Sequence, residues 1–179
     1  MLQKYFIAIV PPDPLLVEIQ DIKQSIFEKY QTKGALMSPG HITLHMPFSF
    51  EGDKEYKLFD CLNEFQYNAA FPIYLNNYDC FEPRVIFINI IKNEELIELQ
   101  KQLVNHVKRS LNLFNQSDDM RGFHPHITIA FRDLKKPVFY KIWEEFKNKS
   151  FERNFSCNSF CLLKHVKDKW VVYKEFSFI

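Results

Sequence analysis

Two segments with the same residue pattern constrain this chain more than any other feature. They read HITL at residues 41–44 and HITI at residues 126–129, so the second begins 85 residues after the first. The whole chain has six histidines and three threonines, and random placement would give only about 0.1 His-x-Thr segments. The doubled pattern therefore indicates two equivalent pieces of structure.

Both segments have the alternation of a half-buried β-strand. Side chains at positions i and i+2 of a strand lie on one face, roughly 6.5–7 Å apart. His41 and Thr43 would then share a polar face, as would His126 and Thr128, while the intervening apolar residues face the core. A helix would scatter the apolar residues and would include a proline soon after or just before the motif.

The elements around the two motifs follow the same order in each half. The first half predicts the order β-α-β-α-β, with elements at 4–10, 15–30, 41–50, 53–65 and 71–81. The second half repeats it and adds a final strand, with elements at 84–91, 93–113, 124–132, 134–147, 151–166 and 170–178. We therefore predict one α+β domain over residues 1–179, with two lobes and an internal repeat of about 3–82 and 84–179.

Composition restricts the class of protein. The chain has 179 residues, is 46% hydrophobic and 16% aromatic, and carries a net charge of +1, so it has enough apolar residues for a core. Residues 1–90 have 7 Lys/Arg and 11 Asp/Glu, whereas residues 91–179 have 16 and 11. No apolar run approaches the ~20 residues of a membrane span. We expect a cytoplasmic monomer with reduced thiols, no membrane association and no obligate protein partner.

The doubled motif suits the chemistry of a phosphodiester. Cleavage requires one group that removes a proton from the attacking hydroxyl and another that protonates the leaving oxygen. Histidine, with a reference pKa near ~6.5, can do either near neutral pH. His41 and His126 are therefore the expected catalytic pair. Thr43 and Thr128 are the expected phosphate contacts, because a hydroxyl can donate to a non-bridging oxygen. No metal or cofactor is needed.

Three further residues fall on the same expected strand faces. His45 follows Thr43 by two positions, His124 precedes His126 by two, and Arg132 lies beyond Thr128 on the same face. Each is a possible substrate contact. The alternative for each residue is a position on the protein surface at the end of a strand, without substrate contact.

Through these two motifs, the chain resembles the 2H phosphoesterase superfamily, which includes 2′-5′ RNA ligases and RNA 2′,3′-cyclic phosphodiesterases. The resemblance rests on HITL at 41–44, on HITI at 126–129 and on the order of elements over nearly the whole chain. It implies a bilobal fold, with two antiparallel sheets flanking a central cleft and helices outside. Both histidines and both threonines would face a phosphate in that cleft.

The resemblance implies a metal-independent phosphodiesterase that acts on 2′,3′-cyclic phosphates or related RNA or nucleotide phosphodiesters. Its partner would be an RNA end or a small cyclic nucleotide. The principal alternative is a catalytically silent RNA- or nucleotide-binding module with the same cleft. The sequence HPHIT at 124–128 is also similar to a histidine-triad hydrolase, but Thr128 replaces the third histidine. A zinc site is disfavoured because no carboxylate or cysteine has a ligand spacing nearby.

Overall fold

The computed structural model describes residues 1–67, 69–115 and 122–178. The helices found there are α1 (Leu15–Tyr30), α2 (Glu55–Glu64), α3 (Glu94–Leu111) and α4 (Lys136–Phe146). The strands found there are β1 (Leu2–Ile9), β2 (Ile42–Glu51), β3 (Phe71–Phe81), β4 (Val85–Ile90), β5 (His126–Ala130), β6 (Glu152–Cys157), β7 (Ser159–Val166) and β8 (Lys169–Ser177). Two short 3₁₀ turns, Gly34–Met37 and Gly52–Lys54, precede β2 and α2. The α+β class and the β-α-β-α-β order of both halves agree with the sequence.

All strands belong to one antiparallel sheet with the order β6-β3-β4-β5-β2-β1-β7-β8. Its two groups of four strands meet where β2 pairs with β5, and the pair there is Ile42 with Ile127. The two antiparallel sheets predicted from the sequence are these two groups of four strands, which the Ile42–Ile127 pair joins into one sheet. The narrow junction leaves two lobes, but backbone pairing at the motifs joins their strands into a single sheet.

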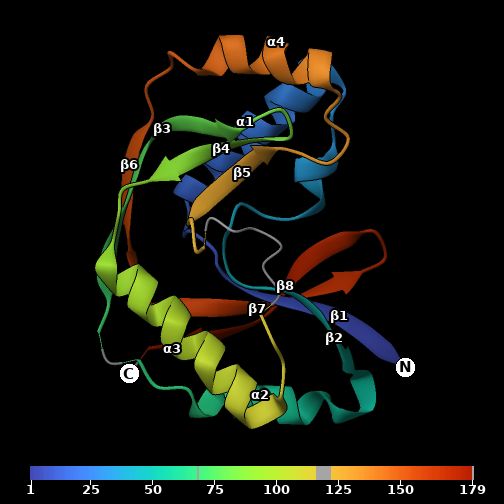
Figure 1. Cartoon of the computed structure of the whole chain (residues 1–179), viewed down its shortest axis with the longest axis vertical. Coiled ribbons are helices and arrows are strands. Elements are labelled where there is room, and N and C mark those ends of the chain that lie inside the picture. The colour runs from blue at the N-terminus through green and yellow to red at the C-terminus, as the bar shows by residue number, and fades with distance from the viewer. Residues whose placement is uncertain (68, 116–121, 179) are drawn as a thin grey trace.

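Each lobe takes strands from both halves of the sequence. β6, the sixth strand of the chain, pairs with β3, and β7 pairs with β1. Helix α1 packs against β5, whereas α3 packs against β2, so these helices cross to the lobe opposite their preceding strand. Figure 1 shows α1 and α4 together at one end of the molecule and α2 and α3 at the other. The repeat boundaries near residue 83 remain a prediction about the sequence.

Helices α1 and α3 each bury one face against the rest of the protein. The buried stripe of α3 is Leu96, Leu99, Leu103 and Val107, at the three- and four-residue spacing of one helix face. In α1 the corresponding stripe contains Leu15, Ile19, Lys23 and Ile26, so a lysine occupies one core position.

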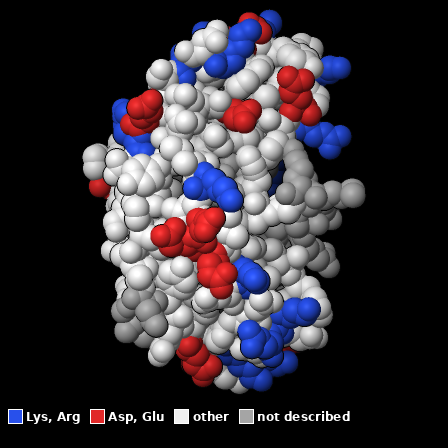
Figure 2. Space-filling view, turned by 60° about the vertical axis from the view of Figure 1, so that its left-hand side comes forward, with Lys and Arg blue, Asp and Glu red and all other residues white. Residues whose placement is uncertain are grey.

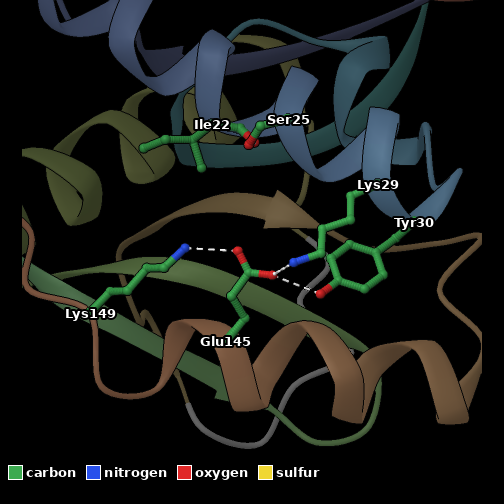
Figure 3. Close-up of polar contacts among 6 residues, drawn as sticks. All are labelled: Ile22, Ser25, Lys29, Tyr30, Glu145 and Lys149. Atoms are coloured by element: carbon green, nitrogen blue, oxygen red, sulfur yellow. Dashed lines mark hydrogen bonds and ion pairs between the residues drawn. The ribbon is translucent and has the colours of Figure 1, made fainter.

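The last turn of α1 is tied to α4 by a single carboxylate. Glu145 accepts from Tyr30 Oη at 2.7 Å and pairs with Lys149 at 2.9 Å and with Lys29 (Figure 3). Hydrogen bonds from Lys149, Lys29 and Tyr30 lower the pKa of Glu145 to about 2. The carboxylate is therefore ionised at neutral pH and fixes α1 against α4.

Within the described ranges, no helix has both the length and the apolar composition needed to cross a membrane.

Candidate active site

The junction between β2 and β5 brings the two motifs together. The strands run antiparallel, with Ile42 opposite Ile127, and both isoleucines are buried. The same antiparallel register, continued by one residue on either side, would set His41 opposite Thr128 and Thr43 opposite His126. Directly opposed side chains in such a pair have Cβ atoms about 4.5–5.5 Å apart, and diagonal ones about 7–8 Å. These four half-buried residues share one side of the sheet, and we call them the two-histidine face.

Both histidine rings are oriented by the same hydrogen bond. Nδ1 of His41 lies 2.8 Å from the carbonyl oxygen of Pro39, and Nδ1 of His126 lies 2.7 Å from that of His124. In each case the carbonyl belongs to the residue two positions earlier. A carbonyl can only accept, so Nδ1 carries the proton in both neutral rings and Nε2 carries the lone pair. The two imidazoles are thereby matched in tautomer as well as in position.

A phenylalanine from the neighbouring strand backs each ring. Phe6 of β1 lies 4.8 Å from the His41 ring, between centroids, at 48°, and Phe87 of β4 lies 4.7 Å from the His126 ring at 46°. Both phenylalanines are buried. The nearly equal geometry extends the pseudo-symmetry of the site to its packing, and it limits the rotation of each imidazole.

His41 is kept neutral by its surroundings. Desolvation by burial is the largest cause, and it lowers the pKa of His41 from 6.5 to about 4. The Pro39 hydrogen bond opposes this effect, while the positive charges of Lys23 and His126 add to it. At pH 7 the His41 imidazole is therefore a neutral base with an available lone pair.

The structure corrects the prediction for His45. Its side chain is 0% exposed, so the proposed substrate contact was wrong. Between Ile7 and Ala8 of β1, the pairing on β2 advances by two residues, from His45 to Thr43. This β-bulge shifts the alternation, and His45 therefore does not continue the face of Thr43. Its Nδ1 contacts the Met46 carbonyl at 2.9 Å and its ring meets Phe48 edge-on.

The other two possible contacts have different positions. His124 is half-buried and supplies the carbonyl that orients His126, while its ring lies edge-on to Phe81 at 5.2 Å. Arg132 is exposed and lies beyond the end of β5 with a φ of 69°, a left-handed turn that breaks the predicted strand. Its guanidinium is 5.1 Å from the Phe131 ring. Substrate contact by His124 or Arg132 remains a prediction.

Asp133 is a structural residue near the site that sequence reasoning missed. It accepts from the Thr32 hydroxyl at 2.6 Å and from the amides of Lys33 and Gly34 at 2.8 and 3.0 Å. A side chain at position 34 would meet the Phe131 carbonyl oxygen at 2.3 Å, so only glycine allows this approach. The carboxylate therefore holds the loop that leads to His41 against the segment that follows β5.

Phe6, Phe87 and Lys23 were also missed. The sequence FIAI at residues 6–9 and FINI at 87–90 is a signal that could have identified the two phenylalanines as equivalent. Helical spacing places Lys23 on the same face as Ile19 and Ile26, but the charge of a lysine normally predicts exposure and hid this signal.

Two surface hollows, of about 350 and 340 Å³, lie away from the two-histidine face. One is between α2 and α3, and the other is beside the β1–α1 connection. The central cleft over the motif residues therefore remains a prediction. Over the described residues, no group of three or more His, Cys, Asp or Glu side chains converges as a metal site would.

Comparison with known proteins identifies the family. The model of the 2′-5′ RNA ligase superfamily matches residues 11–169, so the chain belongs to this family of 2H phosphoesterases. Among curated proteins, none matches the chain significantly.

Solved structures show the same fold. Escherichia coli LigT, complexed with 3′-AMP, is 21% identical with a TM-score of 0.67, and 99% of each chain is covered. The protein TT0787 of Thermus thermophilus is 18% identical with a TM-score of 0.61, covering 98% of this chain and 97% of that one. Usb1 of Kluyveromyces marxianus is 13% identical with a TM-score of 0.51, covering 99% and 97%.

Proposed function

We propose that this chain is a metal-independent phosphodiesterase that opens 2′,3′-cyclic phosphates or cleaves related RNA or nucleotide phosphodiesters. The observation that carries the proposal is the matched pair of histidines, each with Nδ1 bonded to the carbonyl two residues earlier. In this tautomer Nε2 of each ring carries the lone pair, and we infer that these two atoms exchange protons with the substrate. General acid and base catalysis of this kind each contribute typically ~10²–10⁴ in rate.

The reaction divides between the two rings. One imidazole takes a proton from water as its oxygen attacks phosphorus. The bond from phosphorus to one ribose oxygen breaks, and the other imidazolium protonates that oxygen. The hydroxyls of Thr43 and Thr128, each two residues after a catalytic histidine, donate hydrogen bonds to non-bridging oxygens of the phosphate. The product is a ribose monophosphate with a free neighbouring hydroxyl.

Three features of this chain and its relatives support a small nucleotide or an RNA end as substrate. LigT has been solved with 3′-AMP and with ATP, which are a nucleoside monophosphate and triphosphate. The net charge of this chain is only +1. Figure 2 shows cationic and anionic side chains interspersed in small groups on the face drawn, without the continuous basic band suited to a long duplex.

The test is hydrolysis by the purified protein of a panel of 2′,3′-cyclic nucleotides and 2′-5′-linked oligomers, in the presence of EDTA. We expect at least one cyclic nucleotide to be opened to a single regioisomer of the monophosphate, identified by ³¹P NMR. Saturable binding of the panel without turnover would instead support the silent nucleotide-binding module. Activity that is lost in EDTA and restored by zinc would refute the metal-independent mechanism.

A further inference from the structure

Lys23 is the one lysine among the buried polar residues of the described chain. Its side chain is 2% exposed and fills the third position of the α1 stripe, between Ile19 and Ile26. In α3, the third position of the equivalent stripe is Leu103. The two halves of the site therefore differ at this position, because a cation is buried in only one of the two stripes. Burial of an ammonium group is costly, so its presence requires a reason.

The contacts of Lys23 lead directly to His41. Its Nζ donates to the Ser38 carbonyl oxygen at 3.2 Å, and the next carbonyl along the chain, that of Pro39, receives Nδ1 of His41. The intervening Gly40 packs so closely on α1 that an added Cβ would lie 2.8 Å from Cγ2 of Ile19. Helix α1 and Lys23 thus hold the backbone that orients the catalytic ring.

Within the described residues, no carboxylate pairs with the Lys23 ammonium group, which donates to the Ser38 carbonyl oxygen. The charged or titratable groups that act on His41 are Lys23, from α1, and His126, from β5. Burial lowers the pKa of Lys23 to about 8, which still leaves it mostly protonated at pH 7. A buried cation with no carboxylate partner among the described residues therefore acts on His41 and opposes its protonation.

We propose that Lys23 is a positioning residue for His41, and that its buried cation makes His41 the proton acceptor and His126 the proton donor. The role assignment rests on the proposed function, whereas the positioning of His41 by Lys23 does not. Pseudo-symmetry alone would allow the two histidines to exchange roles. Lys23 removes this equivalence, because an imidazolium is disfavoured beside a second positive charge.

The test compares Lys23→Met with Leu103→Met, a matched substitution in the equivalent stripe of α3. Methionine retains the length of the lysine side chain without its charge. The titration of the ¹⁵N-labelled histidine rings is followed by NMR, which requires no turnover. We expect the His41 midpoint to rise by about one pH unit in Lys23→Met, a tenfold change in proton affinity. Leu103→Met should leave this midpoint unchanged. An unchanged midpoint in Lys23→Met would overturn the positioning role.

The same variants are then assayed for phosphodiester cleavage as a function of pH. If His41 is the base, the acid limb of kcat/KM moves to higher pH in Lys23→Met and the alkaline limb stays in place. Movement of the alkaline limb instead would overturn the role assignment. If the wild-type protein cleaves none of the panel, the proposed function fails, while a shifted NMR midpoint still upholds the coupling of Lys23 to His41.

Discussion

Replacing Lys23 by methionine should stabilise the protein at neutral pH. The pKa of Lys23 falls from 10.5 to about 8 because of burial. A change of one in the pKa corresponds to about 1.4 kcal/mol, so burying the charged form of Lys23 costs about 3 kcal/mol. The variant also loses the hydrogen bond to the Ser38 carbonyl, which is worth about 1 kcal/mol. The net expected gain in the free energy of unfolding is about 2 kcal/mol, or roughly 5 °C in Tm for a chain of this length.

The pH dependence gives this prediction its sign. Because the pKa is lower in the folded state, folded protein binds fewer protons than unfolded protein between about pH 8 and 10.5. The cost of burying Lys23 is therefore complete below pH 8 and disappears as the pH rises toward 10.5. The advantage of Lys23→Met should shrink over the same interval and reverse by about 1 kcal/mol at its upper end.

Urea denaturation of wild type and Lys23→Met at pH 7, 9 and 10.5 measures this difference directly. Leu103→Met, which changes a buried apolar side chain of similar volume, serves as the control and should show no pH-dependent difference. A Lys23→Met protein that is less stable at pH 7, or whose difference from wild type is constant across this range, would refute the reasoning.

The remaining predictions concern the site and its supports. Thr128→Val and Thr43→Val should each reduce kcat/KM by up to ~10²–10³, because a hydrogen-bond donor to the phosphate is lost. Thr→Ser at the same position keeps the hydroxyl and should retain most of the rate. An equal loss in the Val and Ser variants would contradict the role of the hydroxyl. Asp133→Asn should lower the free energy of unfolding by about 1 kcal/mol at pH 7. Burial alone would raise the pKa of Asp133, but hydrogen bonds from Thr32, Lys33 and Gly34 outweigh it and lower the pKa. The difference in the free energy of unfolding between wild type and Asp133→Asn should therefore narrow as acid protonates the wild-type carboxylate. Urea denaturation of both proteins at pH 7 and pH 3 measures this difference. Equal stability of the two proteins at both pH values would show that the carboxylate does not hold the loop.

The local elements were largely predictable from the sequence. The bounds of α1 and β3 match the predicted ranges, because apolar periodicity and flanking turn residues define both segments. The second motif strand was predicted as 124–132, but β5 spans only His126–Ala130. Pro125 cannot donate to a ladder, and Arg132 adopts a left-handed conformation. Those two residues shorten the strand at both ends.

Long-range pairing accounts for what could not be predicted. The alternation of residues placed Thr43 and His41 on one face, but the bulge that buries His45 depends on the register with β1. Similarly, the periodicity of α1 places position 23 on the buried face, but a lysine there is understood only from its contact with the Ser38 carbonyl oxygen in the loop before His41. The joining of two lobes into one sheet depends on a single cross-strand pair, Ile42 with Ile127.

The most direct measurement is kcat/KM of His41→Ala, His126→Ala and the double variant on a 2′,3′-cyclic nucleotide that the wild type opens, in EDTA. His106→Gln is the control, because this half-buried histidine contacts the Cys61 carbonyl away from the two-histidine face. Each single substitution should reduce kcat/KM by ~10²–10⁴, and the double variant should be little worse than the poorer single, because the rings act as a unit. His106→Gln should retain the wild-type rate. A single variant that keeps the full rate, or a double variant whose loss is the product of the two singles, would contradict paired acid–base catalysis by His41 and His126.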